Sequence, residues 1–267
     1  MAAFEERILG ATGLAVGPLG LAASYGAPAE AFEEAYDRGC NYFYLGSGRH
    51  RAGMKQAIRN LCAKGQRDRM VIAMQSYARF GYLMEWFFRW NIRSMGLAQA
   101  DILILGWHNR RPSPMLVKRA QAMKARGLCR FLGMSGHNRQ LFPQIAADGQ
   151  FDLFHVRYNA AHRGAESETF PYLTGDSRPG IVTYTATRWG QLLDPGKMPP
   201  GESVPAPSDC YRFVLSHPAV DACLCGPRNI DQMRAALLAL ELGPLGQEDK
   251  ERMQRIGDYV HSNNRRF

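Results

Sequence analysis

Side chains that can transfer protons or polarise a carbonyl stand at the ends of several short apolar runs. These side chains belong to Tyr44, Gln75, His108 and His155. Tyrosine and histidine are common general acids, and a histidine can also orient a carbonyl oxygen by a hydrogen bond. If the runs are parallel strands of one closed sheet, their carboxyl ends meet at one rim. These side chains therefore predict a site for acid–base chemistry at that rim.

The apolar runs alternate with longer stretches of helical period. The predicted strands are 19–23, 41–44, 70–75, 101–105, 129–134, 151–156, 181–185 and 222–225. The predicted helices are 28–39, 51–63, 82–96, 113–126, 140–147, 165–173, 208–216, 230–240 and 247–261. Eight such units predict an α/β fold, a (β/α)₈ TIM barrel forming one domain over residues 1–267, because an open doubly wound sheet usually has about five or six strands. Residues 7–16 are predicted to form a β-hairpin, with Thr12-Gly13 as its turn, that closes the bottom of the barrel.

The composition excludes several classes of protein. Apolar residues make up 46% of the 267 residues and charged residues 21%, which excludes a disordered or collagen-like chain. No apolar stretch approaches the ~18 residues of a membrane helix, and residues 1–7 do not resemble a signal peptide. The six cysteines form no CxxC or zinc-ligand spacing, so we expect reduced core thiols, no metal site and a cytoplasmic protein.

The net charge of +9 comes mostly from arginines spread along the chain. Nucleic-acid binding would favour clustered arginines, so we expect a small-molecule substrate and neither a nucleic-acid nor a membrane partner. A few arginines are expected to meet an anionic ligand such as a nucleotide phosphate. The helix over 82–96 carries an aromatic stripe at Tyr82, Trp86 and Trp90, which we interpret as packing against the barrel, with a protein contact as the alternative.

Seven segments, taken in order, resemble those of aldo-keto reductases. They are LGATGLAVGPLGL, AYDRGCNYFY, RMVIAMQ, SMGLAQADILILGWH, ARGLCRFLGMSGHN, FDLFHVRYN and VLSHPAVDACLCGPRNIDQM, from residue 8 to about residue 240. The resemblance implies a TIM barrel that uses NADPH to reduce a carbonyl group. It also implies a catalytic set of tyrosine, lysine, aspartate and histidine.

The catalytic positions of that family are mostly replaced in this chain. Tyr44 stands at the aspartate position, Gln75 at the lysine position, and Arg49 at the tyrosine position with His50 beside it. The histidine position alone matches, as His108. These five are the candidate catalytic residues, with Tyr44 or His50 as the candidate acid. The alternative for Gln75 is to fill the space of the missing lysine and hydrogen-bond a neighbour.

The cofactor positions of the family are better kept. The resemblance implies a nicotinamide amide contact at Ser135, a stacking aromatic residue at Tyr184 and a phosphate site at the turn around Arg228. The remaining candidates for cofactor binding are His155, Arg188, Gly226, Asn229 and Gln232. Because an arginine gives charge-assisted hydrogen bonds to a 2′-phosphate, we expect NADPH to bind in preference to NADH.

Three further residues are candidates for substrate binding. Trp107 and Trp189 are predicted to lie in rim loops. Each either lines a substrate pocket or packs against neighbouring side chains without a role in binding. Arg157 follows His155 by two residues, so it points the same way if the strand continues, and it either binds an anionic group or forms an ion pair.

Three functions remain open from the sequence. The first is an NADPH-dependent carbonyl oxidoreductase with an atypical active site. The second is a non-redox enzyme on the same barrel, such as a cyclase, isomerase or lyase. The third is a non-catalytic protein that keeps NADP(H) as a ligand.

Overall fold

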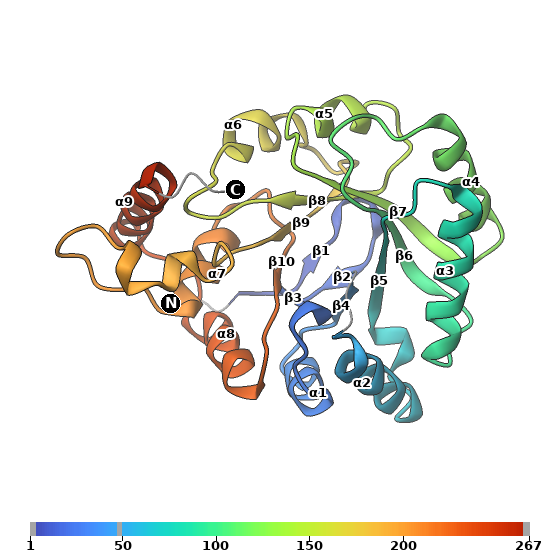
Figure 1. The fold of residues 1–267 in the computed structure, drawn as a ribbon, viewed down its shortest axis with the longest axis horizontal. Coiled ribbons are helices and arrows are strands. Elements are labelled where there is room, and N and C mark those ends of the chain that lie inside the picture. Colours follow the sequence, from blue (N-terminus) through green and yellow to red (C-terminus); the bar gives the residue numbers. More distant parts are fainter. Residues whose placement is uncertain (1–3, 47–49, 264–267) are drawn as a thin grey trace.

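Eight parallel strands close into a barrel in the computed structural model, which describes residues 4–46 and 50–263 (Figure 1). Their order around the barrel is β10, β3, β4, β5, β6, β7, β8 and β9. The strands are β3 (Leu19–Ala22), β4 (Tyr42–Leu45), β5 (Val71–Ser76), β6 (Ala100–Leu105), β7 (Cys129–Gly136), β8 (Leu153–Arg157), β9 (Gly180–Tyr184) and β10 (Ala222–Cys225). The predicted (β/α)₈ TIM barrel is confirmed.

Side chains that alternate along each strand fill two separate cores. On β6, Ile102 and Ile104 point into the barrel, whereas Leu103 and Leu105 pack outward against the helices. All six residues of this strand are buried, as expected for a parallel strand that is covered on both faces. This double burial explains why the strands are mostly apolar runs in the sequence.

The outer layer consists of helices that follow the strands. They are α1 (Ala29–Asp37), α2 (Ala52–Ala63), α3 (Gly81–Ser94), α4 (Pro114–Ala125), α5 (Leu141–Ala146), α6 (Ala165–Glu168), α7 (Pro207–Leu215), α8 (Ile230–Leu242) and α9 (Gln247–Asn263). The stretch predicted as one helix over 165–173 is instead split into α6 and a 3₁₀ turn, Phe170–Tyr172. Thr169 separates the two with non-helical angles (φ −132°, ψ −59°), and Pro171 has no N–H with which to continue the α-helical bonding.

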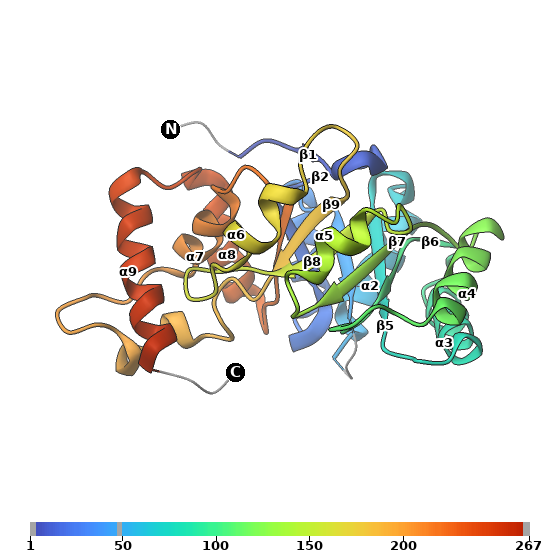
Figure 2. The same cartoon turned by 90° about the horizontal axis from the view of Figure 1, so that it is seen from above.

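The amino-terminal hairpin closes one end of the barrel, as predicted (Figure 2). Its strands are β1 (Arg7–Ile8) and β2 (Ala15–Val16), joined through a 3₁₀ turn at Gly10–Thr12. Leu9, Leu14 and Val16 belong to the same buried cluster as the inward side chains of the barrel strands. The hairpin therefore seals the amino-terminal end of the barrel and leaves the carboxyl-terminal rim for a site.

The aromatic stripe of α3 does not pack against the barrel. Tyr82, Trp86 and Trp90 are 67%, 60% and 54% exposed. The helix buries a second set of side chains at the same spacing of four, namely Met84, Phe88 and Ile92. The prediction was wrong because both sets have helical period and the sequence does not indicate which of them faces inward.

All six cysteines are free thiols, and five of them are buried. Burial raises the pKa of the Cys40 and Cys223 thiols to about 12, so both remain protonated. Within residues 4–46 and 50–263, no helix is both long and apolar enough to cross a membrane. The same residues include no cluster of three histidine, cysteine or acidic side chains that could hold a metal ion.

Candidate functional site

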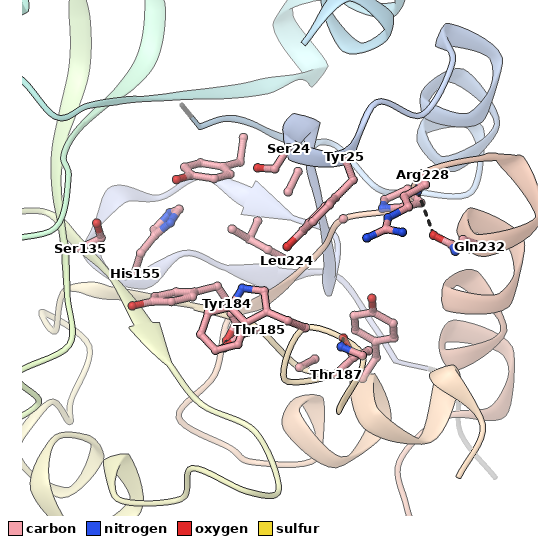
Figure 3. Close-up of a pocket in the computed structure, with 18 of the residues that line it drawn as sticks. Ser24, Tyr25, Ser135, His155, Tyr184, Thr185, Thr187, Leu224, Arg228 and Gln232 are labelled. Atoms are coloured by element: carbon pink, nitrogen blue, oxygen red, sulfur yellow. Dashed lines mark hydrogen bonds between the residues drawn. The ribbon is translucent and has the colours of Figure 1, made fainter. Parts of the chain in front are cut away.

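A cavity of about 890 Å³ opens at the carboxyl-terminal ends of the strands (Figure 3). The structure brings many of the predicted site residues together here. Those that line the cavity are Tyr44, Gln75, Trp107, Ser135, His155, Tyr184, Trp189, Gly226, Arg228 and Gln232. In Figure 3, Ser135, His155 and Tyr184 occupy one end, and Arg228 and Gln232 occupy the other. The cavity therefore joins the predicted catalytic and phosphate-binding ends.

A chain of hydrogen bonds connects the polar side chains at the barrel end of the cavity. The Tyr44 hydroxyl donates to Gln75 Oε1 at 2.8 Å. The Ser135 hydroxyl donates to the same oxygen at 3.2 Å and accepts from the backbone N–H of Trp107 at 3.0 Å. Gln75 thus occupies the centre of the chain as a neutral acceptor, which is the alternative role foreseen for it.

The hydroxyl of Tyr77 was not predicted as part of the site. Tyr77 lies beside Tyr44, is 40% exposed and lines the cavity. Burial raises the pKa of Tyr44 well above its ordinary value, and the neighbouring Tyr77 and Tyr42 raise it further. A signal for Tyr77 existed in the sequence, since it stands two residues beyond Gln75 and side chains on one face of a strand recur every second residue.

His155 forms a neutral part of the cavity wall. The residue is only 1% exposed, and its Nε2 lies 2.8 Å from the Tyr42 hydroxyl. The centroids of the His155 and Tyr44 rings are 5.0 Å apart. Burial lowers the pKa of His155 to about 3, so the imidazole carries no charge at neutral pH.

An aromatic wall runs along one side of the same end. The centroid of the His137 ring lies 6.4 Å from that of Trp107 and 6.2 Å from that of Tyr184. The Tyr184 hydroxyl donates to the carbonyl of Gly136 at 3.0 Å, which fixes the ring. Tyr184 is therefore an ordered aromatic surface against which a planar ring can stack.

The other end of the cavity is built by the turn before α8. Asn229 caps the helix, its Oδ1 accepting from the N–H of Gln232 at 2.9 Å, and Gln232 Oε1 accepts from the N–H of Arg228 at 3.0 Å. The Arg228 guanidinium lies 5.9 Å from the ring centroid of Tyr25, another lining residue that the sequence did not reveal. This end therefore offers a guanidinium beside a helix N-terminus to an anion.

The lining of the cavity is almost uncharged. Among its described residues, Arg228 is the only arginine, and none is lysine, aspartate or glutamate. Hydroxyl, amide and imidazole groups supply the remaining polarity. The site can therefore donate and accept hydrogen bonds, but its described lining includes no carboxylate that could act as a general base.

His108 does not line this cavity. It faces a second hollow of about 580 Å³, on the other side of Trp107. Its Nε2 lies 2.9 Å from Nη1 of Arg79 and must accept that hydrogen bond, because a guanidinium only donates. Burial, with the charge of Arg79 as a lesser cause, lowers the pKa of His108 to about 4. The residue is a neutral acceptor for Arg79, and this placement does not bring it to a ligand in the large cavity.

Other predicted residues also lie outside the lining. Arg188 is 1% exposed, and its Nη1 donates to the carbonyl of Val260 at 2.7 Å, so it points toward α9 and away from a phosphate site. The Asn229 side chain is occupied with capping α8. His50 is exposed, and Arg49 falls outside the described residues.

Arg157 is half-buried at the end of β8 and is likewise not a lining residue. It influences two residues that do line the cavity. Its charge contributes to lowering the pKa of His137, after burial, and it counteracts the effect of burial on Tyr184.

One guanidinium fixes the loop that carries Trp107. Arg79 donates to the carbonyls of Gly106 and Trp107 at 2.9 and 2.8 Å, in addition to its bond with His108. Trp107 has a left-handed backbone (φ 56°), which is uncommon for a bulky residue. Arg79 therefore holds Trp107 in a strained conformation at the edge of the cavity.

Replacing Arg79 with methionine is expected to release this loop. The substitution keeps an apolar stem but removes all three hydrogen bonds to the loop, so we expect the free energy of unfolding to fall by about 1–2 kcal/mol. Urea unfolding of the Arg79→Met protein measures this change. The matched control is Arg110→Met, at an exposed arginine three residues beyond Trp107. Equal stabilities of the two variants would contradict a clamping role for Arg79.

The fold is shared with solved aldo-keto reductases. The apo and holo forms of an enzyme from Bacillus halodurans match with TM-scores of 0.76 and 0.77 at 18% identity, covering 94% of this chain and 95–96% of that one. An enzyme from Klebsiella pneumoniae, in complex with NADP and acetate, matches with a TM-score of 0.77 at 19% identity over 96% of each chain. A Klebsiella pneumoniae aldo-keto reductase in complex with NADPH matches at 0.75 and 20% identity, over 97% of this chain and 96% of that chain.

No family model matches the sequence, and no curated protein matches it. At 18–20% identity, the likeness to the solved structures establishes the fold.

Proposed function

We propose that this chain is a divergent aldo-keto reductase-like enzyme that reduces a carbonyl compound with NADPH in the large cavity. The observation that carries the proposal is that one continuous cavity has the ordered ring of Tyr184 at one end and the guanidinium of Arg228 at the other. Solved proteins of the same fold are described with NADP or NADPH bound, which supports the same choice of ligand.

The residues present fit such a dinucleotide. The volume of about 890 Å³ falls within the range of roughly 300–1,000 Å³ that is usual for ligand sites. Tyr184 would stack on the nicotinamide, and Arg228 would bind the 2′-phosphate. Gln232 and the turn at Gly226 would lie along the phosphates. When bound, NADPH supplies a hydride at the nicotinamide end.

The chain itself has to supply a proton to the developing alkoxide. Tyr77 is the group best placed to donate it, because Tyr77 lines the cavity and is 40% exposed, whereas the proton of Tyr44 is already directed at Gln75. Once Tyr77 has given up its proton, Tyr44 can turn its hydroxyl from Gln75 toward the Tyr77 phenolate and stabilise it. Tyr44 is thus a positioning residue, and Tyr77 is the acid.

The proposed acid lacks the cation that would make it efficient. Gln75 is a neutral amide at the position where the resembling family has lysine, and no lysine lines the cavity among the described residues. A cation beside a tyrosine stabilises the phenolate that remains after its proton is donated, and a neutral amide does not. We therefore expect aldehyde reduction to be slow.

The two alternatives receive less support from the site. A cyclase, isomerase or lyase usually needs a base. No carboxylate lines the described part of the cavity, and burial lowers the pKa of its two histidines, His137 and His155, which makes them weak bases. A non-catalytic NADP(H)-binding protein remains the second candidate, because the neutral Tyr44–Gln75–Ser135 chain resembles a structural network.

Replacement of Arg228 tests the cofactor. In Arg228→Ala we expect NADPH to bind about tenfold or more weakly and NADH to be nearly unchanged, because only NADPH has the 2′-phosphate that the guanidinium would bind. Titrations followed by tryptophan fluorescence measure both affinities, since Trp107 and Trp189 line the cavity. Equal weakening of both nucleotides, or no binding of either by the parent protein, would contradict the proposal.

A further inference from the structure

The outer surface of α3 carries an unusual set of exposed aromatic rings. Phe80, Tyr82, Trp86, Phe87 and Trp90 are between 46% and 67% exposed, and together we call them the aromatic ridge. Trp86 and Phe87 contact each other edge to face, with ring centroids 4.8 Å apart. Contiguous exposed apolar surface of this kind marks an interaction site on a soluble domain.

The ridge lies in the middle of a strongly cationic face. Figures 1 and 2 show α3 on the outer ring beside α4, and a hydrogen bond of 3.1 Å from Lys55 to Asn91 connects α2 to the other side of α3. In the sequence of α2, α3 and α4, the basic residues are Lys55, Arg59, Arg89, Arg93, Lys118, Arg119 and Lys124. Glu85 is the only acidic residue in these three helices.

Glu85 leaves almost no negative charge at the surface. Its side chain is 7% exposed and forms ion pairs of 2.8, 2.8 and 2.7 Å with Arg89, Arg119 and Arg126. The ammonium of Lys55 lies 4.9 Å from the ring centroid of Trp90, so a cation and an aromatic ring meet directly at one edge of the ridge. Lys124 is paired with Asp152 at 2.8 Å. Within the described residues, the basic side chains of these helices that form no ion pair are Lys55, Arg59, Arg93 and Lys118, and they supply the positive charge of this face.

We propose that this face binds peripherally to an anionic lipid bilayer, with the aromatic ridge in the headgroup region. Tryptophan and tyrosine favour that region because their rings are apolar and their N–H and O–H groups reach water. The surrounding lysines and arginines match the negative surface potential of acidic lipids. The inference stands apart from the proposed reductase activity, because no ridge residue lines the catalytic cavity.

Other occupants fit the charges or the shape less well. A second copy docked through the same face would bring two cationic surfaces together. A single-stranded nucleic acid is usually held in a positively charged groove, whereas the ridge is the outward side of one helix and neither described cavity includes a ridge residue. An acidic protein remains as an outcome that the experiment separates.

Co-sedimentation of the full chain with lipid vesicles tests the proposal. We expect binding to vesicles that contain phosphatidylglycerol and much weaker binding to vesicles of phosphatidylcholine alone. The double variant Trp86→Ala/Trp90→Ala should lower the partition coefficient by about tenfold or more, because it removes two interfacial anchors. Arg93→Gln should lower it by about fivefold, because it removes one cation near the surface.

Two matched variants serve as controls. Tyr172→Ala removes a ring that is exposed to the same 67% as Tyr82 but lies outside the ridge, and Arg69→Gln removes an exposed arginine outside α2–α4. Both should bind vesicles like the parent protein. Circular dichroism and NADPH titration check that Trp86→Ala/Trp90→Ala remains folded, independently of lipid.

Several results would overturn the proposal. They are equal binding to both kinds of vesicle, no binding to either, or binding that the ridge variants leave unchanged. A parent protein that sediments as a dimer and becomes monomeric on Trp86→Ala/Trp90→Ala would assign the ridge to a second copy. Ridge-dependent binding of a single-stranded oligonucleotide or of a polyglutamate peptide, without vesicle binding, would assign it to those partners.

Discussion

Tyr77→Phe should lower kcat for the NADPH-dependent reduction of small aldehydes by about 10²-fold or more, with little change in NADPH affinity. The size of the effect follows from the loss of the proton donor, since a positioned general acid contributes about 10²–10⁴-fold. Tyr77 lines the cavity beside Tyr44 and is 40% exposed. Steady-state kinetics over an aldehyde panel measure the change.

Tyr44→Phe and Tyr172→Phe make this experiment specific. Tyr44→Phe leaves the Tyr77 hydroxyl in place and removes only the neighbouring hydroxyl that would stabilise the Tyr77 phenolate, so we expect a smaller loss of about tenfold in kcat. Tyr172→Phe removes an exposed hydroxyl that does not line the cavity and should not change kcat. Turnover by Tyr77→Phe at the parent rate would place the acid elsewhere on the rim. NADPH binding by a parent protein that turns over no aldehyde would favour the non-catalytic alternative.

The protein should lose stability as the pH falls below 6.5, and His155 should account for a large part of the loss. Burial lowers the pKa of His155 to about 3, whereas an unfolded histidine titrates near 6.5. Between these values the unfolded state binds more protons than the folded state, so the free energy of unfolding falls with falling pH. At about 1.4 kcal/mol per pKa unit, we expect this residue to cost about 2–3 kcal/mol between pH 7 and pH 4.5.

Urea unfolding of His155→Gln at both pH values measures this contribution. Glutamine can still hydrogen-bond the Tyr42 hydroxyl but does not titrate, so the difference in stability between pH 7 and pH 4.5 should shrink by about 2–3 kcal/mol. His50→Gln, at an exposed histidine, should keep the parent difference. A parent protein as stable at pH 4.5 as at pH 7 would contradict the burial of a neutral His155.

The strands and helices could be predicted because strands that are buried on both faces stand out in the sequence as short apolar runs. Strands such as β6 are mostly apolar, with only Asp101 charged near its start, and each strand is followed by a stretch of helical period, so the order of elements follows directly. The site could be predicted only in part. Tyr44, Gln75 and Ser135 meet because parallel strands end at one rim. Their proximity therefore follows from the fold alone.

What the sequence could not indicate is the direction of side chains in loops and on helices. His108 follows β6 as expected, but the left-handed Trp107 before it and the guanidinium of Arg79 turn it toward the second hollow. Arg188 likewise has a left-handed backbone (φ 49°) and points to α9. In α3, two sets of apolar side chains have the same helical spacing, and the sequence does not indicate which set is buried.

The hairpin that seals the barrel also bears on how the chain folds. Gly10 sits against the start of β9, where an added Cβ would lie 2.4 Å from the nitrogen of Gly180, and β3 pairs with β10 through Leu21 and Cys225. Gly10 and Gly180 are 170 positions apart in the sequence, and Leu21 and Cys225 are 204 positions apart, so these contacts need most of the ring to be in place. High contact order of this kind slows folding. We therefore expect the hairpin to reach its native place late in folding.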